Sequence, residues 1–117
     1  MKLDHVQLAI PPHSEEQCRA FYCDVLAWSE LPKPTELAKR GGLWLTTGEA
    51  EIHLGVEQDF VPAKKAHPAF LTNDLTELAA KLDANGYEAK WDKSIPKLQR
   101  FFVFDAVGNR LEFIQSA

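Results

Sequence analysis

The 117-residue sequence has only two cysteines, Cys18 and Cys23, which lie five residues apart on a predicted helix. Two cysteines at this spacing form neither a disulfide framework nor a zinc motif, which favours a reducing, cytoplasmic compartment. No apolar run approaches the length of a transmembrane helix. The N-terminal Met1–Asp4 leads into a strand-like segment instead of a signal peptide. These absences predict a cytoplasmic protein that does not enter a membrane.

A strong excess of either charge is also missing. The chain mixes 13 basic with 17 acidic residues and has a formal net charge of -4. Without a basic face or a polybasic run, neither nucleic acid nor a membrane surface is an expected partner. A content of 45% hydrophobic residues is enough for one domain, residues 1–117, with a substantial core.

The first half of the chain predicts a strand, a helix and three further strands. Alternation of apolar and polar residues indicates the strands, and Ser14 followed by acidic residues is typical of a helix N-terminus in which Ser14 is the cap. The expected elements are a strand at Leu3–Ile10, a helix from Ser14 to about Leu26, a short strand near Trp28–Leu31, a polar loop at 32–40, and a hairpin of Leu43–Thr47 with Glu51–Val56.

The same order of elements restarts after a linker at Asp59–Lys65. The expected elements are a strand at His67–Thr72, a helix capped by Asn73 or Asp74 and stopped at Asn85–Gly86, and strands at Tyr87–Trp91, Arg100–Phe104 and Arg110–Gln115. The sequence therefore predicts one strand–helix–strand–strand–strand module at about 1–58 and a second at about 66–117. Each module leaves one sheet face uncovered, so the two must pack against each other or against another chain.

Four polar residues take equivalent positions in the two predicted modules. His5 and His53 lie 48 residues apart (53 − 5), and His67 and Glu112 lie 45 apart (112 − 67). Each pair joins the first strand of a module to its last. Imidazole and carboxylate donors suit Fe(II), Mn(II), Co(II), Ni(II) or Zn(II). The alternative is four unrelated residues, with the histidines satisfied in the core or at the surface and Glu112 facing water.

Other residues are candidates for the wall of a ligand cavity near these four positions. The guanidinium of Arg100 is suited to hold a substrate carboxylate or phosphonate bidentately. A surface arginine at the start of a strand is the alternative interpretation. The remaining candidates are Gln7, Glu51, Phe102 and Arg110.

Five short motifs together resemble the vicinal oxygen chelate superfamily over nearly the whole chain. They are Leu3-Asp-His-Val, the helix end Ala20-Phe-Tyr-Cys-Asp-Val-Leu26, Ile52-His-Leu-Gly, Ala66-His-Pro-Ala-Phe and Gly108-Asn-Arg-Leu-Glu-Phe. This superfamily includes glyoxalase I, fosfomycin-resistance thiol transferases, extradiol dioxygenases and bleomycin-binding proteins. The resemblance implies an α+β fold, in which two βαβββ modules form a cupped mixed sheet around a divalent metal, with helices on the outer face.

Matched position by position, the resemblance places the metal ligands at His5, His53, His67 and Glu112. In glyoxalase I the position of His53 usually holds a glutamate that acts as a base, so a histidine there argues against isomerisation of a glutathione hemithioacetal. Glu51 and Glu112 are then the candidate catalytic proton carriers.

Two functions remain open. One is a metal-dependent lyase or isomerase that acts on a small vicinally oxygenated or anionic substrate. The other is a metal-free binding or sequestering protein of the bleomycin-resistance type. In either case we expect a homodimer, because small relatives commonly dimerise and a sheet edge invites pairing.

Overall fold

The structure is a computed structural model in which residues 1–115 are described. The chain divides into two compact units, Met1–Pro62 and Ala63–Ala117. The boundary lies inside the predicted linker, and the prediction that both units form a single domain stays a prediction. None of the helices within residues 1–115 has the length and apolar character needed to span a membrane.

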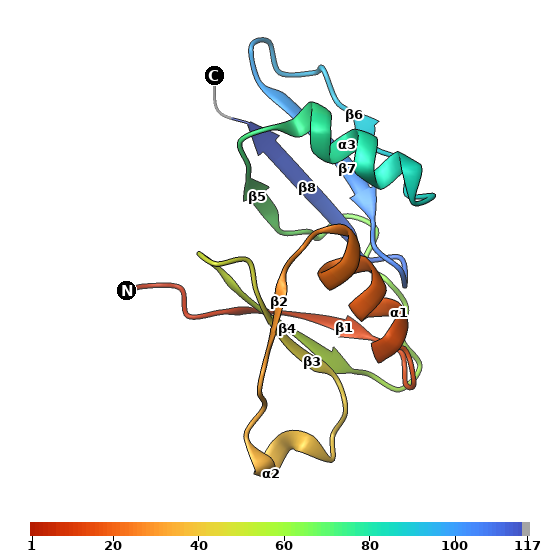
Figure 1. Cartoon of the computed structure of the whole chain (residues 1–117). Coiled ribbons are helices and arrows are strands. Elements are labelled where there is room, and N and C mark those ends of the chain that lie inside the picture. The colour runs from red at the N-terminus through yellow and green to blue at the C-terminus, as the bar shows by residue number, and fades with distance from the viewer. Residues whose placement is uncertain (116–117) are drawn as a thin grey trace. The chain divides into compact units, whose positions relative to one another are not determined.

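The first unit is a four-stranded mixed sheet with a helix across one face (Figure 1). Its strands follow the order β1-β4-β3-β2, with β1 and β4 parallel and the other pairs antiparallel. Its elements are β1 Val6–Ile10, α1 Glu15–Arg19, the π-helix η1 Ala20–Val25, β2 Ser29–Leu31, α2 Thr35–Ala38, β3 Leu43–Thr46 and β4 Glu51–Val56.

The second unit repeats this topology with strand order β5-β8-β7-β6, and α3 lies across its sheet (Figure 1). Again the first and last strands of the unit, β5 and β8, are parallel. Its elements are β5 Ala69–Leu71, α3 Leu75–Ala84, β6 Lys90–Trp91, β7 Gln99–Phe104 and β8 Arg110–Gln115. Two βαβββ units are therefore present, and the predicted α+β fold class is confirmed.

Alternation along the strands divides each sheet into a face that packs against its helix and a helix-free face. In the first unit the packed residues include Ile10, Phe21, Leu43, Leu45, Ile52 and Leu54, all buried. In the second they include Leu75, Leu82, Phe101, Val103, Leu111 and Phe113. Since neighbouring side chains on a strand point to opposite faces, the residues between these apolar positions lie on the helix-free face.

The two predicted helix caps turn out differently. Asp74 caps α3, because its carboxylate accepts a hydrogen bond from the backbone N–H of Glu77 at 3.0 Å. Ser14 does not cap the first helix with its side chain. Its hydroxyl donates to the backbone oxygen of Pro11 at 2.7 Å instead. The prediction that Ser14 acts as a side-chain cap is therefore wrong, although the helix does begin at the next residue.

Several element boundaries also differ from the predictions. The first helix widens into a π-helix from Ala20 onward, with Leu26 N–H bonded to Phe21 O at 3.0 Å. The predicted polar loop contains the short helix α2. The first strands of the two units begin at Val6 and Ala69, so His5 and His67 lie just before the strands that they were predicted to occupy.

Candidate metal and ligand sites on the helix-free faces

His53 and Glu112 occupy the same position in the two sheets. Each is the third residue of the last strand of its unit, and each is buried, with 6% and 4% of its surface exposed. Their Cα partners in the parallel first strands are Gln7 for His53 and Ala69 for Glu112. His5 and His67 each lie two residues before that partner, so the strand register gives the two predicted pairs equivalent places.

In the second unit, His67 and Glu112 meet directly. Nε2 of His67 lies 2.8 Å from Oε1 of Glu112, and Nδ1 lies 2.8 Å from the backbone oxygen of Lys65. A carbonyl oxygen only accepts, so Nδ1 carries a proton and donates it there. Nε2 then faces a carboxylate oxygen and needs a second proton or a cation between the two atoms.

This arrangement fits a divalent cation. The imidazole nitrogen and the carboxylate oxygen converge, and both are suitable donors for a transition metal. A metal-ligating histidine commonly donates its other N–H to a backbone carbonyl, as His67 does to Lys65. The sequence predicted His67 and Glu112 as ligands, and the geometry of this pair is compatible with that role.

Arg100 bonds the other oxygen of Glu112. Its Nη1 donates to Oε2 of Glu112 at 3.2 Å, and its Nη2 donates to Asp92 at 3.2 Å and Ser94 at 3.3 Å. Within residues 1–115, Arg100 Nε is the buried side-chain nitrogen that has no partner. The side chain is 17% exposed. Arg100 therefore neutralises a buried carboxylate, and its predicted role in substrate binding stays a prediction.

Asp92 and Ser94 were not predicted from the sequence. The hydroxyl of Ser94, followed by its backbone N–H, lowers the pKa of Asp92 and keeps that carboxylate ionised beside Arg100. Ser94 N–H lies 2.8 Å from Oδ1 of Asp92, an Asx-turn contact. The sequence pattern Asp-x-Ser directly after a predicted strand is typical of an Asx turn, and it was the signal from which this contact could have been predicted.

Phe102 and Arg110, two predicted substrate-binding residues, lie on this same face. Phe102 is the cross-strand partner of Glu112, and its ring meets the ring of His67 edge-on at 5.2 Å. The guanidinium carbon of Arg110 lies 4.0 Å from the centroid of Phe102. Both residues therefore adjoin the His67–Glu112 pair.

In the first unit, His53 is held between two other rings. Its ring centroid lies 4.1 Å from Trp44 and 3.9 Å from His5, with interplanar angles of 9° and 18°. Imidazole lone pairs lie in the ring plane, so stacked rings do not aim their nitrogens at one point. The donor types of His5 and His53 fit a metal, but joint ligation requires one ring to rotate. The His5 side chain is 39% exposed and contacts Asp4, which leaves it room to do so.

Glu51 and Gln7 also lie beside His53. Oε2 of Glu51 is 2.7 Å from Nε2 of His53. Gln7 lies over Gly55, where an added Cβ would stand 2.7 Å from the Gln7 amide nitrogen. A larger residue at that position would therefore displace the Gln7 amide from its place over the strand.

Within residues 1–115, no group of three or more histidine, cysteine, aspartate or glutamate side chains is placed to hold a metal. Each unit instead contributes one pair. The complete set of four ligands therefore stays a prediction.

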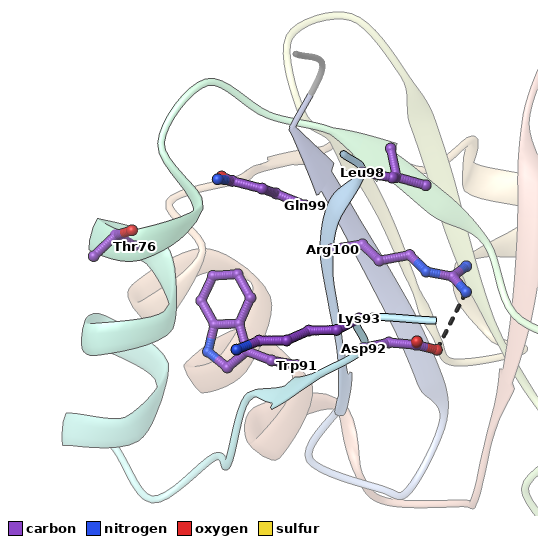
Figure 2. Close-up of a pocket in the computed structure, with 7 residues that line it drawn as sticks. All are labelled: Thr76, Trp91, Asp92, Lys93, Leu98, Gln99 and Arg100. Carbon is purple, nitrogen blue, oxygen red and sulfur yellow. Dashed lines mark hydrogen bonds and ion pairs between the residues drawn. The ribbon is translucent and has the colours of Figure 1, made fainter. Parts of the chain in front are cut away.

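A pocket of about 420 Å³ opens beside the edge strand β6 of the second sheet (Figure 2). It is lined by Thr76, Trp91, Asp92, Lys93, Leu98, Gln99 and Arg100. Figure 2 shows the side chains of Arg100 and Asp92 pointing toward each other, with Thr76 contributed by α3. Arg100 is the lining residue that also contacts the His67–Glu112 pair.

Solved structures resemble this chain along its whole length. A glyoxalase family protein from Bacillus anthracis is 47% identical, with a TM-score of 0.95, and the match covers 100% of this chain and 96% of that chain. TnmS3, an antibiotic binding protein from a Streptomyces species, is 21% identical with a TM-score of 0.72, covering 100% and 99%. Neither a family model nor a curated protein matches the chain.

A mutant of FosX, a fosfomycin resistance protein from Listeria monocytogenes, was solved with Mn(II) and 1S,2S-dihydroxypropylphosphonic acid. It is 14% identical with a TM-score of 0.80, and the match covers 99% of this chain and 90% of that chain. At 14% and 21% identity, FosX and TnmS3 show the shared fold alone.

The paired βαβββ units, with polar side chains on their helix-free faces, define a protein of the vicinal oxygen chelate superfamily. The resemblance predicted from the sequence is confirmed. At 47% identity to the Bacillus anthracis protein, the chain belongs to the glyoxalase family.

Proposed function

We propose that this protein is a metal-dependent enzyme of the lyase or isomerase type that acts on a small vicinally oxygenated or anionic substrate. The contact between His67 and Glu112 carries the proposal, because a half-buried imidazole nitrogen and a buried carboxylate oxygen converge there. The proposed ligands are His5, His53, His67 and Glu112. A bound divalent ion supplies Lewis acidity toward adjacent substrate oxygens.

Glu51 is the preferred proton carrier in this proposal. Its Oε2 already lies 2.7 Å from His53, while its side chain is 37% exposed and so exchanges protons with water. Glu112 is the other candidate, but both of its oxygens are bonded, to His67 and to Arg100. A carboxylate with a free edge is better placed to take a proton from a substrate carbon.

The remaining predicted residues are proposed to bind and orient the substrate. Phe102 offers an apolar surface next to Glu112, and the two arginines supply hydrogen-bond donors on the same face. Gln7 supplies an amide beside His53 in the first unit. A small ligand with oxygens and an anionic group matches this mixture of donors and aromatic surface.

Changing His53 to glutamate is expected to raise hemithioacetal isomerase activity above that of the wild type, which should be low. The substitution keeps a metal donor and places a carboxylate where the glyoxalase I resemblance has its base. The assay measures isomerase turnover together with metal content. Thr46→Glu is the matched control, since it adds the same charge on the same face at a residue outside the proposed site. An efficient wild-type isomerase that His53→Glu weakens would contradict these roles.

A metal-free binding protein is the second candidate function. The stack of Trp44, His53 and His5 favours it, because a flat aromatic ligand can extend such a stack by packing against the ring at its end. The fold shared with the antibiotic binding protein TnmS3 is compatible with this function. Elemental analysis of protein purified without chelator separates the two functions. A transition metal in that sample supports the enzyme, and its absence supports the binding protein.

We also propose a cytoplasmic homodimer. Cys18 and Cys23 are free thiols, as expected in a reducing compartment, and burial, followed by the charges of Glu30 and Asp24, raises the pKa of Cys23.

The edge of the second sheet supports the proposed dimer. Strand β5 is that edge and carries Leu71, which is 76% exposed. Sedimentation velocity at micromolar concentration should give the mass of two chains. A single-chain mass throughout a concentration series would contradict the dimer.

A further inference from the structure

The two arginines on the helix-free face of the second unit have different surroundings. Arg100 donates from Nη1 to Glu112 and from Nη2 to Asp92 and Ser94. Both carboxylates that neutralise it belong to the protein. Three of its five donors are therefore occupied, and a ligand anion would have to compete with Glu112 and Asp92 for its charge.

Within the described part of the chain, Arg110 has no ion pair of this kind, although its charge, after the Ser94 hydrogen bonds and the charge of Arg100, also lowers the pKa of Asp92. Among residues 1–115, no carboxylate forms an ion pair with it, although Glu112 lies only two residues further along the same face. Both oxygens of Glu112 are already bonded to His67 and Arg100. The guanidinium of Arg110 instead stacks on Phe102 at 4.0 Å.

Stacking leaves the hydrogen-bonding edge of this guanidinium open. An aromatic ring takes one face of the planar group, while the N–H donors lie in its plane and point away from the ring. Because Phe102 is fixed opposite Glu112 by the strand register, Arg110 is held beside the proposed metal pair. A preordered guanidinium with free donors loses little conformational entropy when it binds a planar or tetrahedral oxyanion.

A second unpaired cation lies on the same face. Lys90 is the cross-strand partner of Phe102, and its Nζ lies 5.0 Å from the centroid of Phe104. Phe104 is in turn the cross-strand partner of Arg110. Among residues 1–115, Lys90 forms no ion pair with a carboxylate. The first unit differs, because the position equivalent to Arg110 is Glu51, which bonds His53.

We infer that Arg110, stacked on Phe102, binds the anionic group of the ligand, a carboxylate or a phosphonate, and that Lys90 adds to its positive field. Arg100 also positions Glu112, so the donors that it can still offer a substrate are secondary to those of Arg110. The inference deepens the proposed function by naming the charge class of its substrate. It places a specificity-determining residue two positions before the proposed metal ligand Glu112.

The test measures binding of three small probes to the full chain by titration in ¹⁵N–¹H correlation spectra. Methylphosphonate and lactate carry the anionic group, and lactamide is the neutral counterpart of lactate. Arg110→Met is expected to weaken the binding of both anions about 10- to 100-fold, as loss of a charge-assisted pair predicts, and to leave lactamide unchanged. Arg40→Met is the matched control, because it removes the same charge from an exposed site in the first unit.

Arg110→Lys keeps the charge but not the bidentate fork, so it should fall between the wild type and Arg110→Met. It also serves if the methionine variant does not fold, which the dispersion of the same spectra reports. Equal anion affinity in wild type and Arg110→Met overturns the inference, as does a wild type that binds neither anion.

Metal content measured on the same samples separates this inference from the proposed function. Anion binding that depends on Arg110 in a protein without metal supports the inference and contradicts the metal enzyme. Bound metal together with an anion affinity that does not depend on Arg110 contradicts the inference and supports the metal enzyme.

Discussion

Glu112→Gln is expected to lower the affinity for a divalent transition metal by more than about a hundredfold, because changes at outer-shell partners already cost about 10–100-fold and this change reaches a proposed ligand. The amide has the shape of the carboxylate but lacks its charge. Wild-type protein made without chelator should carry a near-stoichiometric amount of zinc, nickel, cobalt, manganese or iron. Affinity is measured by competition with a chromogenic chelator, and content by elemental analysis.

The control for this prediction is Glu88→Gln, which removes the same charge from an exposed site in the second unit. It should bind metal as the wild type does. His5→Ala tests the pair in the first unit, and the four-ligand proposal requires it to weaken binding as well. Full binding by His5→Ala, with loss in Glu112→Gln, would restrict the site to the second unit. A wild type that takes up no metal at neutral pH would remove the enzyme proposal.

The chain order of the fold was predictable because each element carries a local pattern. Alternation in β4 places Ile52 and Leu54 on one face and His53 on the other, as the sequence predicted. The repeated spacing between His5 and His53 and between His67 and Glu112 predicted equivalent positions, and the strand registers show them. Periodicity fixes the face on which a residue lies, because backbone geometry alone determines it.

Side-chain partners were not predictable, since they depend on residues distant in the sequence. The stacking of His53 between His5 and Trp44 and its contact with Glu51 were not predicted, while the ligand roles of the two histidines stay predictions. The ion pairs of Arg100 with Glu112 and Asp92 were not predicted, and its role in substrate binding stays a prediction. The alternation along a strand predicts that these side chains share a face of the sheet. It does not predict which neighbouring side chain each of them bonds.

The two helix caps show the same limit within a few residues. Ser14 and Asp74 have similar local sequences, each with an acidic residue in the first helical turn. Asp74 has only a carboxylate, which must accept, and it accepts from Glu77 N–H. Ser14 has a hydroxyl that can donate, and the carbonyl of Pro11 lies within reach. The outcome depends on the path of the preceding loop, which the pattern does not encode.

The turn between β7 and β8 fixes the register that brings Phe102 opposite Glu112, and its centre is the buried Asp105. Oδ1 of Asp105 accepts from the backbone N–H groups of Val107 at 2.9 Å and Asn109 at 2.8 Å. Its Oδ2 accepts from the Asn109 side chain at 3.2 Å. Gly108 completes the turn with a φ of 98°, a conformation that favours glycine.

Asp105→Ala is therefore expected to lower the free energy of unfolding by about 3 kcal/mol, because it leaves buried N–H donors without the charged acceptor. Asp105→Asn should cost about 1 kcal/mol, since its amide oxygen keeps the two backbone contacts while its NH₂ meets the Asn109 amide. Urea unfolding followed by circular dichroism gives these values. Asp24→Ala, at an exposed aspartate, should stay within about 0.5 kcal/mol of wild type. If Asp105→Ala were no more destabilising than Asp24→Ala, the turn would not be what aligns β7 with β8.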